Sequence, residues 1–413
     1  MRRSLFHGSV SRLRHARWLS TDAFSALEHD MWQKGAVAYE DLFTKVTGQC
    51  SNALLDGAGV LMTKSMAVHV VEKVPLESRD DGLRVLDVAT GPGCVALAAA
   101  KRGAREVVGL DFSAAMLKQA QTAVDAYEYP ECISLVEGDA AKLPLPDASF
   151  DAVTIGFGLL HLPRPEAALA EAYRVLKPGG KISFSVWSPA AKNGPGLLGN
   201  GAQGTNAPDA KQDRPTGFDL MLGAIASHGN PNVSLPSVAD GKQALPFFHF
   251  ADTGNATEAL AAAGFDAASV SAVQVPCVAS LQDEHQLFDM FATATARTRA
   301  TLELQTAEER LAIEEAVASA VRTGYRGYLT YNLPSARNTT TGDRLNDQPG
   351  TDSIVFDSTA PGQTWTGGRT PFSVPMPAIV VSATKAAKAT EPAKATKAGE
   401  PKAKKATKAK KAP

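Results

Sequence analysis

The sequence predicts an α/β fold: a doubly wound, mostly parallel sheet of seven strands, with a helical N-terminal segment and inserted cap segments. Strands and helices alternate between residues 84 and 187. The first strand, over 84–88, turns through Gly91 and Gly93 into a helix, and such a turn lets backbone approach a ligand closely. The next apolar run ends at Asp111, and an acid about 20 residues beyond such glycines binds ribose hydroxyls in Rossmann-type units. We therefore expect a nucleoside-bearing cofactor at the carboxyl edge of the sheet.

The segment over residues 22–78 is predicted to be a helical cap in front of the sheet. Trp32, Tyr39 and Phe43 recur there at helix-like spacing. A second helix is expected over 52–74, interrupted by two glycines and closed by a proline.

The core of the sheet is predicted over residues 79–187. Its strands are expected over 84–88, 106–110, 133–137, 152–156 and 181–187. Its helices are expected over 95–102, 114–127 and 166–175. Ligands of such sheets bind beyond the carboxyl ends of the strands. Asp87, Asp111, Asp139 and Gly156 are all predicted to lie at that edge.

Residues 188–385 are expected to add an insert, a helical cap and the last strands to the same domain. The Gly-, Pro-, Asn- and Ser-rich part over 188–245 is predicted to be mostly loop. The other predicted segments are a helix over 257–264, a strand over 268–278, helical structure over 284–323, a poorly ordered loop over 331–370 and a strand over 372–384.

Charge divides the chain into an acidic body and two basic ends. Residues 1–20 carry +5 and residues 386–413 carry +7, so that residues 21–385 carry −13. An acidic body is a poor surface for phosphate backbones. No apolar run reaches the length of a membrane span, and the four scattered cysteines predict neither a disulfide framework nor a metal site.

The basic ends predict two further segments. Residues 1–19 have five Arg and no acid, the composition of a mitochondrial transit peptide, with a plastid or cytoplasmic location as the alternative. The tail over 386–413 repeats Lys, Ala, Thr and Pro and is expected to be disordered. Its composition favours a solvated end over a contact with nucleic acid or anionic lipid.

Three more segments decide the kind of cofactor. They are Glu-Gly-Asp-Ala at 137–140, Leu-Pro-Leu-Pro-Asp-Ala-Ser-Phe-Asp at 143–151 and Arg-Val-Leu-Lys-Pro-Gly-Gly-Lys at 174–181. In this order after Asp87 and Asp111, they resemble the class I S-adenosylmethionine-dependent methyltransferases. The most similar branch is the type 11 group, which is like the ubiquinone/menaquinone C-methylases. The resemblance covers residues 84–187 strongly and implies S-adenosylmethionine as cofactor.

The resemblance also implies roles for individual residues. The implied cofactor-binding residues are Asp87, Ala89, Gly91, Gly93, Asp111, Phe112, Asp139, Ala140, Gly156 and Phe157. Asp111 would accept hydrogen bonds from both ribose hydroxyls, since a carboxylate offers two oxygens. Asp139 would meet the adenine amino edge and Phe157 the methionine end. Asp87 would lie near the methionine amino group or orient the loop. Ala89 departs from the family pattern, in which a glycine is common.

The sequence contains no pattern that identifies a general base. His161 follows the fourth strand and is a weak catalytic candidate, because such a residue more often packs against the cofactor or a lid. We expect the acceptor pocket to be walled by Trp32, Tyr39, Phe43 and the segment over 247–291. Enclosure of this kind favours a small-molecule acceptor, but O-, N-, S- and C-methylation all stay open.

Three alternative functions remain open. Quinone-ring C-methylation is favoured by the resemblance and the predicted compartment, although the inserts do not follow the quinone enzymes closely. A dehydrogenase is suggested by Gly91-Pro92-Gly93-Cys94-Val95-Ala96, which fits a dinucleotide-binding pattern, but the sequence has no recognisable hydride-transfer residues. The non-enzyme alternative is a methyltransferase-like assembly or interaction factor without turnover.

Overall fold

The computed structural model describes residues 23–61, 82–189, 215–237, 245–325 and 372–387. The predicted leader, the predicted loop over 331–370 and nearly all of the basic tail lie outside these ranges.

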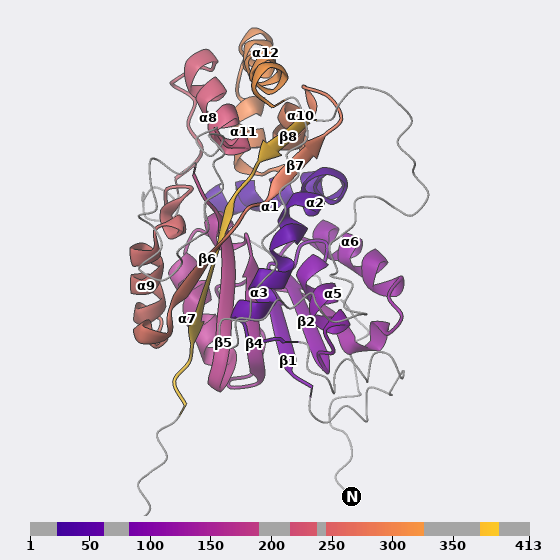
Figure 1. The fold of residues 1–413 in the computed structure, drawn as a ribbon, viewed down its shortest axis with the longest axis vertical. Coiled ribbons are helices and arrows are strands. Elements are labelled where there is room, and N and C mark those ends of the chain that lie inside the picture. Colours follow the sequence, from indigo (N-terminus) through magenta and orange to yellow (C-terminus); the bar gives the residue numbers. More distant parts are fainter. Residues whose placement is uncertain (1–22, 62–81, 190–214, 238–244, 326–371, 388–413) are drawn as a thin grey trace, which may run out of the picture.

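Seven strands form one sheet in the order β3-β2-β1-β4-β5-β9-β6 (Figure 1). Their bounds are β1 Arg84–Val88, β2 Glu106–Asp111, β3 Ile133–Glu137, β4 Phe150–Gly156, β5 Leu176–Trp187, β6 Ser271–Val275 and β9 Ala378–Thr384. The strands from β3 to β5 are parallel, whereas β9 is antiparallel to both of its neighbours. The predicted seven-stranded, mostly parallel sheet is thus confirmed. The strand order along the sheet changes direction between β1 and β4, and ligands of such sheets bind at this point.

Helices cover both faces of the sheet (Figure 1). The first face carries α3 Ser51–Gly57, α5 Cys94–Lys101 and α6 Ala114–Asp125, and the second carries α7 Pro165–Val175 and α9 Thr253–Ala262. The central strands are apolar runs because both of their faces are buried. Gly57 allows α3 to approach β5, since a Cβ at this position would lie 2.7 Å from Oγ of Ser183.

A second group of elements lies beyond one end of the sheet, and we call it the roof (Figure 1). The roof consists of α1 Ala23–Ala38, the π-helical turn Tyr39–Phe43, α2 Thr44–Thr47, α8 Gly217–His228, β7 Val278–Leu281, α10 Gln286–Ala294, α11 Arg297–Glu303, α12 Ala307–Gly324 and β8 Phe372–Pro375. Strands β7 and β8 pair antiparallel in a sheet of their own. Short 3₁₀ turns occur at Gly48–Cys50, Pro130–Cys132, Leu159–His161, His249–Ala251 and Ala267–Ser269.

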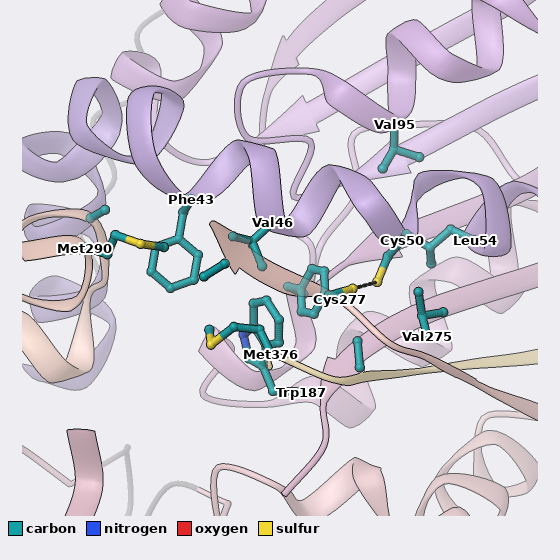
Figure 2. Packing of buried hydrophobic residues seen from close by; sticks show 14 of the residues in the cluster. Phe43, Val46, Cys50, Leu54, Val95, Trp187, Val275, Cys277, Met290 and Met376 are labelled. Atoms are coloured by element: carbon teal, nitrogen blue, oxygen red, sulfur yellow. Dashed lines mark hydrogen bonds between the residues drawn. The ribbon is translucent and has the colours of Figure 1, made fainter. Parts of the chain in front are cut away.

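A shared apolar core joins the roof to the sheet. Figure 2 shows Phe43 of the roof directed toward Met376 and Trp187, which belong to segments far apart in the sequence. In the same core, Sγ of Cys50 lies 3.3 Å from Sγ of Cys277. All four cysteines are free thiols.

The expectation of loop over residues 188–245 is wrong for its described second part. Helix α8 occupies Gly217–His228 and begins with a capping box. Oγ1 of Thr216 accepts a hydrogen bond from the Asp219 backbone, and the Asp219 carboxylate accepts one from the Thr216 backbone. The glycines and prolines around this segment are typical of loops, and the prediction was based on them.

Three other expected elements are divided in the structure. The predicted strand over 268–278 is two strands, β6 and β7, separated at Pro276, which has no N–H to donate. The predicted strand over 372–384 divides in the same way into β8 and β9, on either side of Pro377. The predicted helical region over 284–323 consists of α10, α11 and α12, and Thr306 caps the last of them. The helix expected over 52–74 ends at Gly57 as α3, and residues 62–74 lie outside the described ranges.

Candidate active site

A cavity of about 510 Å³ lies between the carboxyl ends of the central strands and the roof. Its volume is in the range of small-molecule sites. Of the ten predicted cofactor-binding residues, every one except Gly93 lines this cavity. The structure therefore brings together residues that are up to 70 positions apart, between Asp87 and Phe157.

Asp111 ends β2 and lies against the glycine turn. Its Oδ2 accepts a hydrogen bond of 2.8 Å from the Gly91 backbone, and its Oδ1 accepts one of 2.9 Å from the Ser113 backbone. Burial raises the pKa of Asp111 to about 6, and these backbone donors oppose the shift. The hydrogen bonds fix the orientation of the carboxylate, and each oxygen keeps a second lone pair.

Asp87 is held by hydroxyl groups within the protein. Its Oδ2 accepts a hydrogen bond of 2.6 Å from Thr90, and its Oδ1 accepts one of 2.8 Å from Thr154 on β4. Burial raises the pKa of Asp87 to about 6, against the effect of these donors. The carboxylate therefore links β1, β4 and the turn between β1 and α5, which fits the orienting role considered for it.

Two non-glycine residues beside the cavity have left-handed backbone conformations. Ala89 has a φ of 54° and Phe157 a φ of 55°, a region that L-residues rarely adopt. Backbone strain of this kind concentrates at functional sites. Gly93 has a φ of 88° at the N-cap of α5, so its role in the described structure is to make the turn rather than to line the cavity.

The segment that follows β3 forms another part of the cavity wall. Gly138, Asp139 and Ala140 follow β3 and line the cavity, and Oδ1 of Asp139 accepts a hydrogen bond of 2.8 Å from the Ala141 backbone. Phe112 also lines the cavity and packs edge-on against the His29 ring of α1 at 5.4 Å.

The part of the cavity under the roof is aromatic. Phe157 stacks on Trp187 with 4.1 Å between ring centroids, and Phe218 lies 5.0 Å from Trp187 and 4.8 Å from Phe247. The lining aromatic residues of this part, which we call the aromatic lobe, are Trp32, Tyr39, Phe43, Phe157, Trp187, Phe218 and Phe247. Trp32, Tyr39, Phe43 and the beginning of the 247–291 segment were predicted to line the acceptor pocket, and they do line the aromatic lobe. Trp187 and Phe218 were not predicted.

A polar cluster at the cavity wall was not predicted as a unit. Glu28 of α1 is only 1% exposed, and its Oε2 lies 3.1 Å from Nδ1 of His161. Its Oε1 accepts a hydrogen bond of 2.8 Å from Nε of Arg297 on α11. The sequence had singled out His161 alone. No feature of the sequence pointed to Glu28 or to Arg297.

Residues 86–184 match the model of a methyltransferase domain family. A ubiquinone/menaquinone biosynthesis C-methyltransferase of Ruegeria sp. is 41% identical over 27% of this chain and 46% of its own length. A demethylmenaquinone methyltransferase of Thermus thermophilus is 40% identical over 36% of this chain and 64% of its own length. Residues 86–184 therefore form a class I S-adenosylmethionine-dependent methyltransferase domain. The family match sets the dehydrogenase alternative aside.

The chain spans about half the length of the curated relatives it matches. Among solved structures, the YcgJ protein of Bacillus subtilis aligns with a TM-score of 0.37 and 16% identity, over 77% of this chain and 98% of its own chain. Within the described ranges, no helix has the length and apolarity needed to cross a membrane. The same residues contain no cluster of three His, Cys, Asp or Glu side chains that could hold a metal ion.

Proposed function

We propose that this protein transfers a methyl group from S-adenosylmethionine to a small-molecule acceptor held in the aromatic lobe. The observation that carries the proposal is a single cavity with two chemically different parts. One part is bounded by the strand-end acids and the glycine turn, and the other by the side chains of the aromatic lobe.

The cofactor part fits an adenosyl ligand. Asp111 presents a fixed carboxylate suited to a ribose diol, and the space beside Gly91 is open, since a Cβ there would meet nothing within 4 Å. We assign the adenine end to Phe112, Asp139 and Ala140. Gly156 and Phe157 are assigned to the methionine end, together with the turn at Ala89.

When bound, the cofactor supplies a methyl group that its sulfonium has already activated for displacement. The protein then has to orient the acceptor and exclude water. Correct orientation contributes on the order of 7–11 kcal/mol in the best intramolecular comparisons. The stacked Phe157 and Trp187 rings offer a flat apolar wall on which a planar acceptor can be positioned beside the methionine end.

Quinone-ring C-methylation is a second candidate, because curated relatives at about 40% identity are named for ubiquinone and menaquinone biosynthesis. A large planar ring also suits an aromatic lobe. This chain's similarity covers only part of those enzymes, so the ring acceptor is one member of the small-molecule class that we propose.

The test is calorimetric titration of the full chain with S-adenosylmethionine and with S-adenosylhomocysteine, followed by incubation with methyl-labelled cofactor and a fractionated metabolite extract. We expect saturable heat for both compounds and label in a low-molecular-weight product. The absence of heat for both would refute the proposal. Binding without label transfer to any fraction would favour the non-catalytic assembly factor.

We further propose a mitochondrial location, which the arginine-rich, acid-free composition of residues 1–20 supports. The full chain with a C-terminal fluorescent tag should colocalise with mitochondria, and replacing the five arginines with alanine should abolish this. Plastid or cytoplasmic fluorescence of the unmodified chain would contradict the proposal.

A further inference from the structure

His161 and Glu28 form a hydrogen-bonded pair across the cavity wall. His161 ends the 3₁₀ turn after β4, and Glu28 belongs to α1, 133 residues earlier. Nδ1 of His161 lies 3.1 Å from Oε2 of Glu28, and both residues line the cavity. The His161 ring packs edge-on against Trp32 with 4.8 Å between centroids, which fixes the plane of the imidazole.

Three donors surround the Glu28 carboxylate. Besides His161, Nε of Arg297 donates to Oε1 at 2.8 Å and the Trp32 indole donates to Oε2 at 3.0 Å. Burial alone would raise the pKa of Glu28, but His161 and Arg297 outweigh that effect and hold the pKa below its usual value. Arg297 also donates to the Leu160 carbonyl, next to His161. Glu28 is therefore held as an anion.

An anionic carboxylate determines which imidazole nitrogen carries the proton. A carboxylate can only accept hydrogen bonds, so Nδ1 of a neutral His161 must be the protonated nitrogen. Nε2 then keeps a lone pair, and within the described part of the chain it has no hydrogen-bond partner. A carboxylate that orients an imidazole in this way is the arrangement used by histidine bases in acyl transfer.

Neighbouring groups are less suited to accept a proton. Asp111 is assigned to the ribose hydroxyls of the cofactor, and both oxygens of Asp87 accept threonine hydroxyls. Burial raises the pKa of the Cys94 thiol to about 12, and the Tyr39 hydroxyl donates to Thr47.

We propose that His161 is the general base of this methyltransferase and that Glu28 is its positioning residue. The inference rests on the proposed function and narrows its acceptor to one that loses a proton, such as a phenolic or enolic hydroxyl. The electron pair of the acceptor oxygen forms the bond to the methyl carbon, and the acceptor proton passes to Nε2. The bond from that carbon to sulfur breaks with its electron pair, which leaves a neutral thioether.

The first test uses no cofactor, so its outcome is independent of the proposed function. Long-range ¹H–¹⁵N spectra of the full chain with ¹⁵N-histidine, at about pH 8.5 where an ordinary imidazole is neutral, report the tautomer. His161→Gln assigns the signal. We expect the Nδ1–H tautomer in the wild type. In Glu28→Gln we expect a mixture, because an amide can both donate and accept. An Nε2–H tautomer in the wild type would overturn the proposal, and an unchanged tautomer in Glu28→Gln would overturn the positioning role.

The second test separates chemistry from cofactor binding. With methyl-labelled S-adenosylmethionine and the fractionated extract, His161→Gln should lower kcat by about 10²- to 10⁴-fold, the range for a lost general base. Its KM for the cofactor should stay unchanged. The matched control is His249→Gln, a histidine whose Nδ1 lies 3.4 Å from Nδ2 of Asn255 and which does not line the cavity. If His161→Gln binds cofactor and transfers label as fast as the control, His161 is not the base. If the wild type fails to bind cofactor, the proposed function fails instead.

Discussion

The Gly91 backbone donates a hydrogen bond of 2.8 Å to Oδ2 of Asp111, so that the turn after β1 and the acid that ends β2 hold each other in place. Burial raises the pKa of this carboxyl group to about 6. The group is thus largely ionised at neutral pH and becomes protonated in mild acid.

Cofactor affinity should therefore fall below about pH 6. Each pH unit below the pKa should weaken binding about tenfold, because only the ionised carboxylate can accept from both ribose hydroxyls. Asp111→Asn should bind about 10- to 100-fold more weakly at pH 7.5, the loss expected for a hydrogen bond to a charged group. It should also lose most of the pH dependence. Calorimetry from about pH 5 to 7.5 measures both effects, with the exposed Asp125→Asn as control. If Asp111→Asn and the control bind the cofactor with equal affinity, Asp111 does not bind the ribose hydroxyls.

Asp87 should make the stability of the protein depend on pH. Its pKa is raised from 3.8 to about 6 by burial, so the native state binds the proton more tightly than the unfolded chain. This contribution to the free energy of unfolding is complete below about pH 4 and is lost as pH rises through 6. The free energy of unfolding of Asp87→Asn, relative to that of the wild type, should increase by about 2 kcal/mol between pH 4.5 and pH 7. This is the part of the pKa shift, converted to free energy, that falls within this pH range. Urea unfolding at the two pH values measures it, and a difference that stays constant would contradict the buried ionisation.

Ala89 should tolerate glycine better than Gly158 tolerates alanine. The left-handed φ of 54° strains Ala89 by about 1–2 kcal/mol, and glycine would relieve this at a smaller cost in unfolded-state entropy. A Cβ at Gly158 would lie 2.7 Å from Cβ of Ala89. We expect Ala89→Gly to be slightly stabilising and Gly158→Ala to be strongly destabilising. In the double variant, part of the Gly158→Ala loss should be recovered. Thermal unfolding of the four proteins forms a complete cycle, and strict additivity would show that the two residues do not interact.

The aromatic lobe should govern acceptor binding without affecting the cofactor. Phe218 contacts Trp187 and Phe247 but comes from α8, away from the glycine turn. Phe218→Leu should raise the KM for the acceptor several-fold and leave the affinity for S-adenosylhomocysteine within twofold. The matched control is Phe265→Leu, a buried aromatic on the other side of the sheet. An equal change in acceptor KM for both variants would mean that the effect comes from stability alone.

Cys50 and Cys277 should cross-link under an oxidant. Their sulfur atoms are 3.3 Å apart and buried (Figure 2), and a disulfide needs about 2.05 Å, so only a small movement separates the two states. Treatment with diamide should give a peptide linked through these residues while Cys94 and Cys132 stay reduced. Peptide mapping checks this, with Cys277→Ser as control. A different pairing would contradict the packing of the Gly48–Cys50 turn against the connection between β6 and β7.

The sequence predicted the sheet core well because buried parallel strands are apolar runs with clear boundaries. Asp87, Asp111 and Asp139 end three such runs, and parallel topology alone places their ends at one edge. The roof was harder to predict. Helix α8 lies in a Gly- and Pro-rich region, where local signals favour loop. The pairing of Glu28 with Arg297 joins residues 269 positions apart, and no local pattern encodes such a contact.

The position of β9 has a consequence for how the chain reaches its native state. This strand comes last among the described elements, yet it lies between β5 and β6 and bonds to both. On the ribosome, β6 therefore emerges long before the strand that it needs as its partner. Until residue 384 has been synthesised, β5 presents an unpaired edge, which is a liability for aggregation. Emergence of β9, rather than completion of the parallel half, is thus the step at which we expect the sheet to close.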